Sequence, residues 1–265
     1  GMMDWAREQF AGIAFDDGKL TPERLEFQLR CYLANKDINA EHGLDFISVK
    51  CMTELSDHYV PQCMSAALMP GPYDGEGSKE PCAMSCEADG DGALTMEILK
   101  EISGGGSTLF GDVSHMDAAK KILYLPNCGG MCSWFAGRSD DPSENLGKIE
   151  LRPSLRPGGG ATTYFTAAPG PVTLARLYRV AGAYRMAIIP GEAVRMTDDD
   201  LQEFVRERGR HQLPTAFVRV DCDLHRLVDE FGSNHISGVA GTWVRELEQL
   251  CEMLDVQPVV MDRTF

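Results

Sequence analysis

The chain has 265 residues, enough for one large domain or two ordinary ones, each with its own core. Its formal charge of −15 comes from 40 acidic and 25 basic residues, which argues against nucleic acid as a partner, because such binding needs clustered Lys and Arg. No apolar run approaches the ~20 residues of a membrane-spanning helix, and no signal segment is evident. We therefore expect no membrane partner and a cytoplasmic location. Gly1 ahead of Met2 is typical of tag removal and is set aside.

The nine cysteines are odd in number, and no CxxC pair occurs. The closest pairs, Cys82/Cys86 and Cys128/Cys132, are each separated by four positions. In extended chain their sulfurs would lie about 13 Å apart, too far to share one zinc ion. Reduced, scattered thiols are therefore expected rather than a disulfide framework.

In the first half of the chain, strand patterns alternate with helix patterns. Thr21 and Pro22 fit the N-cap and first position of a helix over 21–36. Further helical patterns cover 54–69 and 93–102, and short apolar runs predict strands at 44–51, 80–88, 107–113 and 121–128. This alternation indicates a parallel sheet with crossover connections.

After Cys128, Gly and Pro recur every few residues between short alternating apolar runs, at 161–167, 172–180 and 184–191. Such runs predict antiparallel strands and a small barrel. An apolar stripe predicts a last amphipathic helix over 236–254, followed by a short strand at 257–262. The expected fold class is therefore α/β plus β: a parallel α/β domain over 1–106, then a mostly antiparallel β-barrel domain with a C-terminal helix over 107–265.

The segment Cys86–Lys100, CEADGDGALTMEILK, first suggests a calcium site. If Glu87 is position 1 of an EF-hand loop, Asp89, Asp91 and Gly92 stand at the required third, fifth and sixth positions. Position 12, which should be a bidentate Glu, is Ile98. The neighbouring Glu97 points about 100° away on a helix. Calcium is therefore a weak interpretation.

Strand ends offer a better role for Glu87. Glu87 ends one predicted strand, and Asp112 lies near the end of the next. If these strands are neighbours in a parallel sheet, both carboxylates lie on its carboxyl edge, where functional side chains gather. Asp89 and Asp91 would then serve as the N-cap and first-turn acid of the following helix.

His235 stands at the predicted start of the last helix, after Ser233 and Asn234. The helix dipole disfavours an imidazolium there, which would keep the ring neutral and available to a metal. A capped surface histidine is the alternative. His115 is the one other histidine close to Asp112 in the sequence.

Five blocks in order, CEADGDGALTMEIL, FGDVSHMD, LPNCGGMCSWFA, RPGGGATTYF and SNHISGVAGTWVRELEQLCEMLDVQPVV, resemble the L-fucose isomerase family and, more distantly, L-arabinose isomerase. The resemblance runs from about Gly43 to the C-terminus. It implies manganese, or another divalent cation, bound by Glu87, Asp112 and His235, with Glu87 and Asp112 as the acid and base. Asn127 and Asn234, in the third and fifth blocks, are expected to bind substrate.

The resemblance also implies the function: a metal-dependent aldose–ketose isomerase that passes through an ene-diol on a sugar such as L-fucose or L-arabinose. Family chains have an N-terminal α/β domain, a three-layer α/β middle domain and a C-terminal β-barrel, in a homo-oligomer where a neighbour's first domain completes the site. Here the first domain has no counterpart, so a truncated catalytic portion is expected. The alternative is a non-catalytic carbohydrate-binding or regulatory remnant.

Overall fold

The structure is a computed structural model that describes residues 1–208 and 213–261. Its helices are α1 Met2–Gln9, α2 Pro22–His42, α3 Glu54–His58, α4 Cys63–Leu68, α5 Gly90–Ile102, the 3-10 helix η1 Ser133–Ala136, α6 Pro142–Leu146, α7 Asp198–Arg208, α8 Leu224–Glu230 and α9 Val244–Met253. Its strands are β1 Gly12–Ile13, β2 Phe46–Val49, β3 Tyr73–Asp74, β4 Gly77–Ser78, β5 Ala83–Cys86, β6 Thr108–Asp112, β7 His115–Asp117, β8 Ile122–Pro126, β9 Glu150–Pro153, β10 Ala161–Tyr164, β11 Gly170–Val180, β12 Ala183–Ala193, β13 Thr215–Val220, β14 His235–Ala240 and β15 Gln257–Val260.

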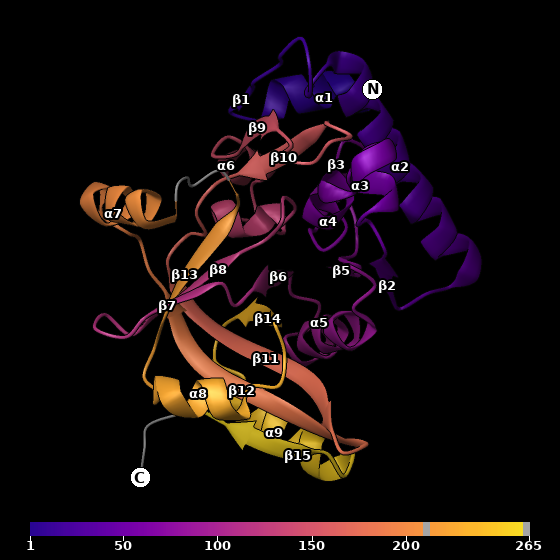
Figure 1. The fold of residues 1–265 in the computed structure, drawn as a ribbon. Coiled ribbons are helices and arrows are strands. Elements are labelled where there is room, and N and C mark those ends of the chain that lie inside the picture. Colours follow the sequence, from indigo (N-terminus) through magenta and orange to yellow (C-terminus); the bar gives the residue numbers. More distant parts are fainter. Residues whose placement is uncertain (209–212, 262–265) are drawn as a thin grey trace.

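The largest sheet follows the order β6-β14-β11-β12-β13-β8-β7, and β15 pairs with β12. All of its pairings are antiparallel except β12–β15. The long strands β11 and β12 curl it into a half-barrel (Figure 1). The antiparallel character predicted for the second half of the chain is confirmed, and the final short strand is present as β15.

The strands of the first half do not form one parallel sheet. Among the described strands, β5 pairs only with β2, in parallel, and β6 pairs instead with β14. The expectation that the strands of Glu87 and Asp112 are sheet neighbours is therefore wrong. A crossover helix between two strands favours parallel pairing, but here the chain leaves α5 for the half-barrel, where β14 offers a longer antiparallel partner.

The prediction of one helix over 236–254 is also wrong. Residues 236–240 belong to β14, Gly241 follows with φ +104°, and the helix α9 begins only at Val244. A short apolar run fits both helical and strand periods, so periodicity alone could not separate them. In the same way the helical pattern over 54–69 is two short helices, α3 and α4, on either side of Pro61.

Helix α5 lies between the β2–β5 pair and strands β11 and β14 of the half-barrel (Figure 1). The largest buried apolar cluster draws on all of these elements and on α2, with members such as Leu29, Met84, Met96, Leu174 and Ile236. One apolar core thus runs beneath both predicted domains, and the boundary at residue 106 stays a prediction. Among the described residues, no helix combines the length and apolar character needed to cross a bilayer.

Helix α2 is attached to the β3–β4 hairpin by a buried carboxylate. Asp74 is 5% exposed and accepts hydrogen bonds from the Tyr32 hydroxyl and, at 2.6 Å, from Lys36 Nζ. The same ammonium lies 2.6 Å from the exposed carboxylate of Glu76. Burial raises the pKa of Asp74, but Lys36 and Tyr32 outweigh it and hold that pKa below its usual value.

Asp74→Asn should lower the free energy of unfolding by about 2–4 kcal/mol, because it removes the buried charge that the Tyr32 hydroxyl and the partly buried Lys36 ammonium share. Glu76→Gln removes only the exposed partner and should change it by less than about 1 kcal/mol. Because the folded pKa is lowered, the contribution of Asp74 is present above about pH 4 and is lost as the pH falls through the lowered pKa. Urea denaturation at several pH values measures both effects. Equal losses in the two variants would contradict the assignment.

Candidate active site

Three side chains that are far apart in the sequence meet at the end of the β6–β14 ladder. Asp112 and His235 are directly opposite each other in the register of these strands. Glu87 reaches the same place from the turn between β5 and α5. His235 Nε2 lies 3.4 Å from Glu87 Oε2 and 3.4 Å from Asp112 Oδ1. The structure thus brings together the three residues named from the sequence, although by strand pairings that the sequence did not predict.

Glu87 occupies a backbone conformation that is unusual for its residue type. Glu87 and Ala88 have φ of 61° and 58°, in the left-handed region. A residue with a Cβ in that region costs about 1–2 kcal/mol, and such strain concentrates at functional sites. The turn is held by backbone hydrogen bonds from Ala88 N to Val49 O and from Asp89 N to Cys86 O. It starts α5 and leaves the Glu87 carboxylate beside His235.

His235 is the first residue of β14 and does not start a helix. Burial lowers the pKa of its imidazole, but the hydrogen bonds and charges of Asp112 and Asp89 outweigh burial and raise that pKa to about 9. The expectation that a helix dipole keeps His235 neutral is therefore wrong. The ring packs against Phe110, with centroids 4.8 Å apart. Packing and charge together fix the orientation of the imidazole.

Asp89 has two roles. As predicted it is the N-cap of α5, with Oδ1 accepting a hydrogen bond from Gly92 N at 2.9 Å. Its Oδ2 also lies 2.7 Å from His235 Nδ1, and Arg176 on β11 binds both carboxylate oxygens, at 2.5 and 2.9 Å. The side chains of Asp89 and Arg176 are only 11% and 8% exposed. This pair anchors the Nδ1 side of the ring and turns Nε2 toward Glu87 and Asp112.

Nothing in the sequence indicates the second role of Asp89, because an N-cap aspartate already explains its position and Arg176 lies 87 residues away. Asp91 behaves as predicted: it lies in the first turn of α5, where it pairs with the exposed Arg179 at 2.9 Å. Asp89 and Asp91 thus lie two positions apart at the start of α5, but Asp89 pairs with buried partners and Asp91 pairs with an exposed arginine.

The other predicted site residues lie in two different settings. Asn234 Nδ2 donates to Asp112 Oδ1 at 3.1 Å, so Asn234 belongs to the cluster. Asn127 is buried; its amide donates to Phe110 O, and its Oδ1 accepts from the backbone of Gly129 and Gly130. These contacts hold the turn after β8. The substrate-binding roles of both asparagines stay predictions.

His115 lies on β7, where its ring packs against Tyr124 and Phe204, with centroids 4.9 and 6.5 Å away. It therefore belongs to an aromatic cluster on the outer strands of the half-barrel. Among residues 1–208 and 213–261, no group of three or more His, Cys, Asp or Glu side chains is placed so that it could hold a metal ion. In the carboxylate–histidine cluster the imidazole pairs directly with both acids instead.

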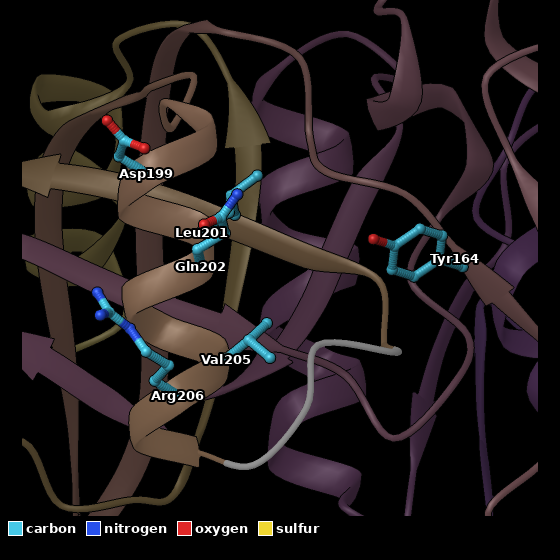
Figure 2. Close-up of a pocket in the computed structure, with 6 residues that line it drawn as sticks. All are labelled: Tyr164, Asp199, Leu201, Gln202, Val205 and Arg206. Carbon is cyan, nitrogen blue, oxygen red and sulfur yellow. The ribbon is translucent and has the colours of Figure 1, made fainter.

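One small cavity touches the cluster, and a larger cavity lies apart from it. A small cavity of about 10 Å³ lies against Glu87 and is also lined by Arg156 and four cysteines. A larger cavity of about 590 Å³ lies between Tyr164 of β10 and residues of α7, among them Asp199 and Arg206 (Figure 2). None of Glu87, Asp112 and His235 lines the larger cavity, so it is separate from the carboxylate–histidine cluster.

Sequence comparison agrees with the resemblance. Sulfoquinovose isomerase from Priestia aryabhattai is 24% identical over 261 residues, which are 98% of this chain and 52% of that protein. Sulfoquinovose isomerase from Alkalicoccus urumqiensis is 26% identical over 164 residues, 61% of this chain and 33% of that protein. The chain spans about half the length of the first relative. The sequence model of the L-fucose isomerase C-terminal domain matches residues 125–262, more than half of the 265 residues, and the chain therefore belongs to the L-fucose isomerase family.

Proposed function

We propose that this chain carries the reaction centre of a metal-dependent aldose–ketose isomerase. The observation that carries the proposal is the placement of His235 Nε2 at 3.4 Å from the carboxylates of both Glu87 and Asp112. Asp89 and Arg176 hold the imidazole from its other side. Family membership and the isomerases among the relatives support the same reaction class.

The donor types of the cluster suit a divalent cation such as manganese. His235 Nε2 lies 3.4 Å from an oxygen of Glu87 and 3.4 Å from an oxygen of Asp112, so these three side chains would hold a cation after a rearrangement of the cluster. Two carboxylates and one imidazole suit manganese or magnesium, whereas thiolates would favour zinc or copper. Histidine ligands normally have their second ring nitrogen held by a carboxylate, as Asp89 holds Nδ1 here. A bound cation would stabilise the negative charge of an ene-diolate and align the two substrate oxygens.

The residues of the chain account for the proton transfers. The side chains of Glu87 and Asp112 are 34% and 30% exposed, so a substrate can reach both. One carboxylate removes the proton from C2 of the aldose while O1 gains a proton, which gives the ene-diol. Return of a proton to C1 and loss of the O2 proton complete the ketose. Asn234 donates to Asp112 Oδ1, which leaves Oδ2 available for this exchange.

Cation binding is the primary test, because the chain spans about half of its first relative and weak or no turnover is expected from it alone. Glu87→Gln and His235→Ala should each weaken manganese binding at least about tenfold, since each removes a ligand. Calorimetric titration at neutral pH measures this. Asp91→Asn, a charge change on the same helix start, is the matched control and should bind as the unmodified chain does.

If manganese affinity is equal in the unmodified chain, Glu87→Gln and His235→Ala, the reaction centre is not where we place it. The non-catalytic carbohydrate-binding remnant is then the better description. If Glu87→Gln and His235→Ala bind manganese normally and only Asp91→Asn has a changed affinity, then Asp91, and not Glu87, is the acid near the start of α5 that binds the cation.

Asp89→Asn tests the support behind the histidine. The asparagine amide has a single acceptor oxygen, so it cannot accept hydrogen bonds from His235 Nδ1 and from both terminal nitrogens of Arg176 as the carboxylate does. The imidazole of His235 then loses the contact that holds it in place. Manganese affinity should fall about 10–100-fold, the usual effect of losing a residue that orients a metal ligand. The manganese electron paramagnetic resonance spectrum should change as well. An Asp89→Asn protein that is folded and binds manganese as Asp91→Asn does would show that Asp89 acts only as a helix cap.

Arg156 supports an anionic sugar as the substrate. Its side chain lines the small cavity beside Glu87, and it makes no hydrogen bond or ion pair with any described residue. In a chain with a formal charge of −15, a guanidinium without a partner beside the reaction centre suits a sulfonate or a similar anion. Relatives that are sulfoquinovose isomerases favour the sulfonated sugar over L-fucose or L-arabinose.

Arg156→Gln should reduce the preference for sulfoquinovose over D-glucose, which has a hydroxyl in place of the sulfonate, by about tenfold or more, because a charge-assisted hydrogen bond is lost. Dissociation constants of the two sugars in the presence of manganese measure the preference. Arg152→Gln is the control: Arg152 already pairs with Glu150 and stacks on Tyr164, and its loss should leave the preference unchanged. An unchanged preference in Arg156→Gln would remove the argument for an anionic substrate.

A further inference from the structure

Helix α5 begins with two glycines in its first turn, Gly90 and Gly92. Glycine weakens a helix relative to alanine, so a glycine in this place calls for a physical reason. At Gly90, an added Cβ would meet no described heavy atom within 4 Å outside its own helix and chain neighbours. At the second glycine, the added Cβ would lie 2.7 Å from Asp89 Oδ2, 2.7 Å from Phe110 Cε2 and 2.8 Å from Arg176 Nη1. Non-bonded carbon atoms normally approach to about 3.5–4.0 Å, so at least one of these groups would have to move.

The three groups that would meet this Cβ all support the imidazole of His235. Asp89 Oδ2 lies 2.7 Å from His235 Nδ1, and Arg176 holds both oxygens of the same carboxylate. Phe110 packs against the other side of the contact, with its ring centroid 4.8 Å from that of His235. All three side chains are largely buried, so none can swing freely into solvent. Whichever group gives way, the imidazole loses one of the contacts that orient it.

The backbone of Gly92 is held in place as well. Its N–H donates a hydrogen bond to Asp89 Oδ1 at 2.9 Å, and its carbonyl oxygen accepts one from Ser237 Oγ at 3.3 Å. Ser237 is buried on β14, two residues after His235, so the two side chains lie on the same face of the strand. Gly92 is therefore bound both to the start of α5 and to the strand that carries the histidine. A retreat of the helix that made room for a side chain would break these contacts.

We propose that Gly92 is a positioning residue for His235, because its missing side chain leaves the space in which the supporting groups converge on the imidazole. The orientation of the ring decides where Nε2 points, and here Nε2 lies beside the carboxylates of Glu87 and Asp112. The placement of the ring does not depend on what the cluster does. The consequence that Gly92 controls cation affinity rests on the proposed function, because only then is Nε2 a metal ligand.

Gly90→Ala and Gly92→Ala make the same chemical change two positions apart on one helix. Gly90→Ala should raise the urea midpoint slightly, because alanine restricts the unfolded chain and suits a helix. Gly92→Ala should not raise it. In the metal-free protein, Gly92→Ala should also shift the nuclear magnetic resonance signals of the His235 ring, which are identified by their loss in His235→Ala. A folded Gly92→Ala with unchanged His235 signals would overturn the proposal, as would an equal shift in Gly90→Ala.

If Gly92→Ala does not fold, the comparison moves to Phe110→Leu. The shorter side chain frees the space at Phe110 Cε2, while Asp89 and Arg176 still face the added methyl group. Phe110→Leu combined with Gly92→Ala should then fold and should differ from Phe110→Leu alone in the His235 signals. Identical signals in these two proteins would overturn the proposal.

Manganese titration of the unmodified chain and of both glycine variants tests the consequence for the cation. Gly92→Ala should bind manganese about tenfold or more weakly, the usual effect of disturbing the support of a metal ligand, and Gly90→Ala should bind as the unmodified chain does. The manganese electron paramagnetic resonance spectrum should change in Gly92→Ala and not in Gly90→Ala. Shifted His235 signals with unchanged manganese affinity would overturn the link to the cation. An unmodified chain that binds no manganese would refute the proposed function, while the His235 signals still decide the role of Gly92.

Discussion

The antiparallel pairing of β6 with β14 is the constraint on which the site depends. It sets Asp112 directly opposite His235. Asn234, which precedes His235 and donates a hydrogen bond to Asp112, lies 122 residues from Asp112 in the sequence. A slip of one residue would turn His235 to the other face of the sheet. The register is protected by close packing at Gly238, where an added Cβ would lie 2.8 Å from Leu174 Cδ2 and 3.2 Å from Leu109 Cγ. A larger residue at this position would require the side chains of Leu174 and Leu109 to shift.

Helix α5 ties that ladder to the first half of the chain. Its N-cap, Asp89, faces Arg176 on β11 and His235 on β14, so the charge that begins the helix also binds two strands of the half-barrel. Burying charges costs free energy unless each is paired, and the bidentate contact supplies most of that pairing. Arg176 Nε remains without a partner among the described residues. The arrangement therefore favours a defined ring orientation for His235 over maximal stability.

Glu87 stands between two chemically different groups. On one side are His235 and Asp112, which suit a hard cation and proton transfer. On the other are four free thiols that line the small cavity beside Glu87. The left-handed turn at Glu87 and Ala88 separates the two within a few residues of chain.

The sequence by itself determined local features and the residues of the site. Thr21 with Pro22 marked the start of α2, Asp89 marked the start of α5, and the turn-punctuated second half indicated antiparallel strands. The ordered blocks that resemble the L-fucose isomerase family singled out Glu87, Asp112 and His235, which the structure brings together. These signals are carried by neighbouring residues or by a family pattern, so they can be read along one chain.

Only the tertiary structure decided which strands pair and which buried side chains share a charge. Nothing within Ile236–Ala240 distinguishes a strand from the first turns of a helix, and the strand forms because β6 and β11 lie on either side of it. The link from Arg176 through Asp89 to His235, and the gathering of the thiols at Glu87, join residues that are distant in sequence. Periodicity and capping rules describe interactions within a few residues, whereas these contacts arise when separate segments pack into one core.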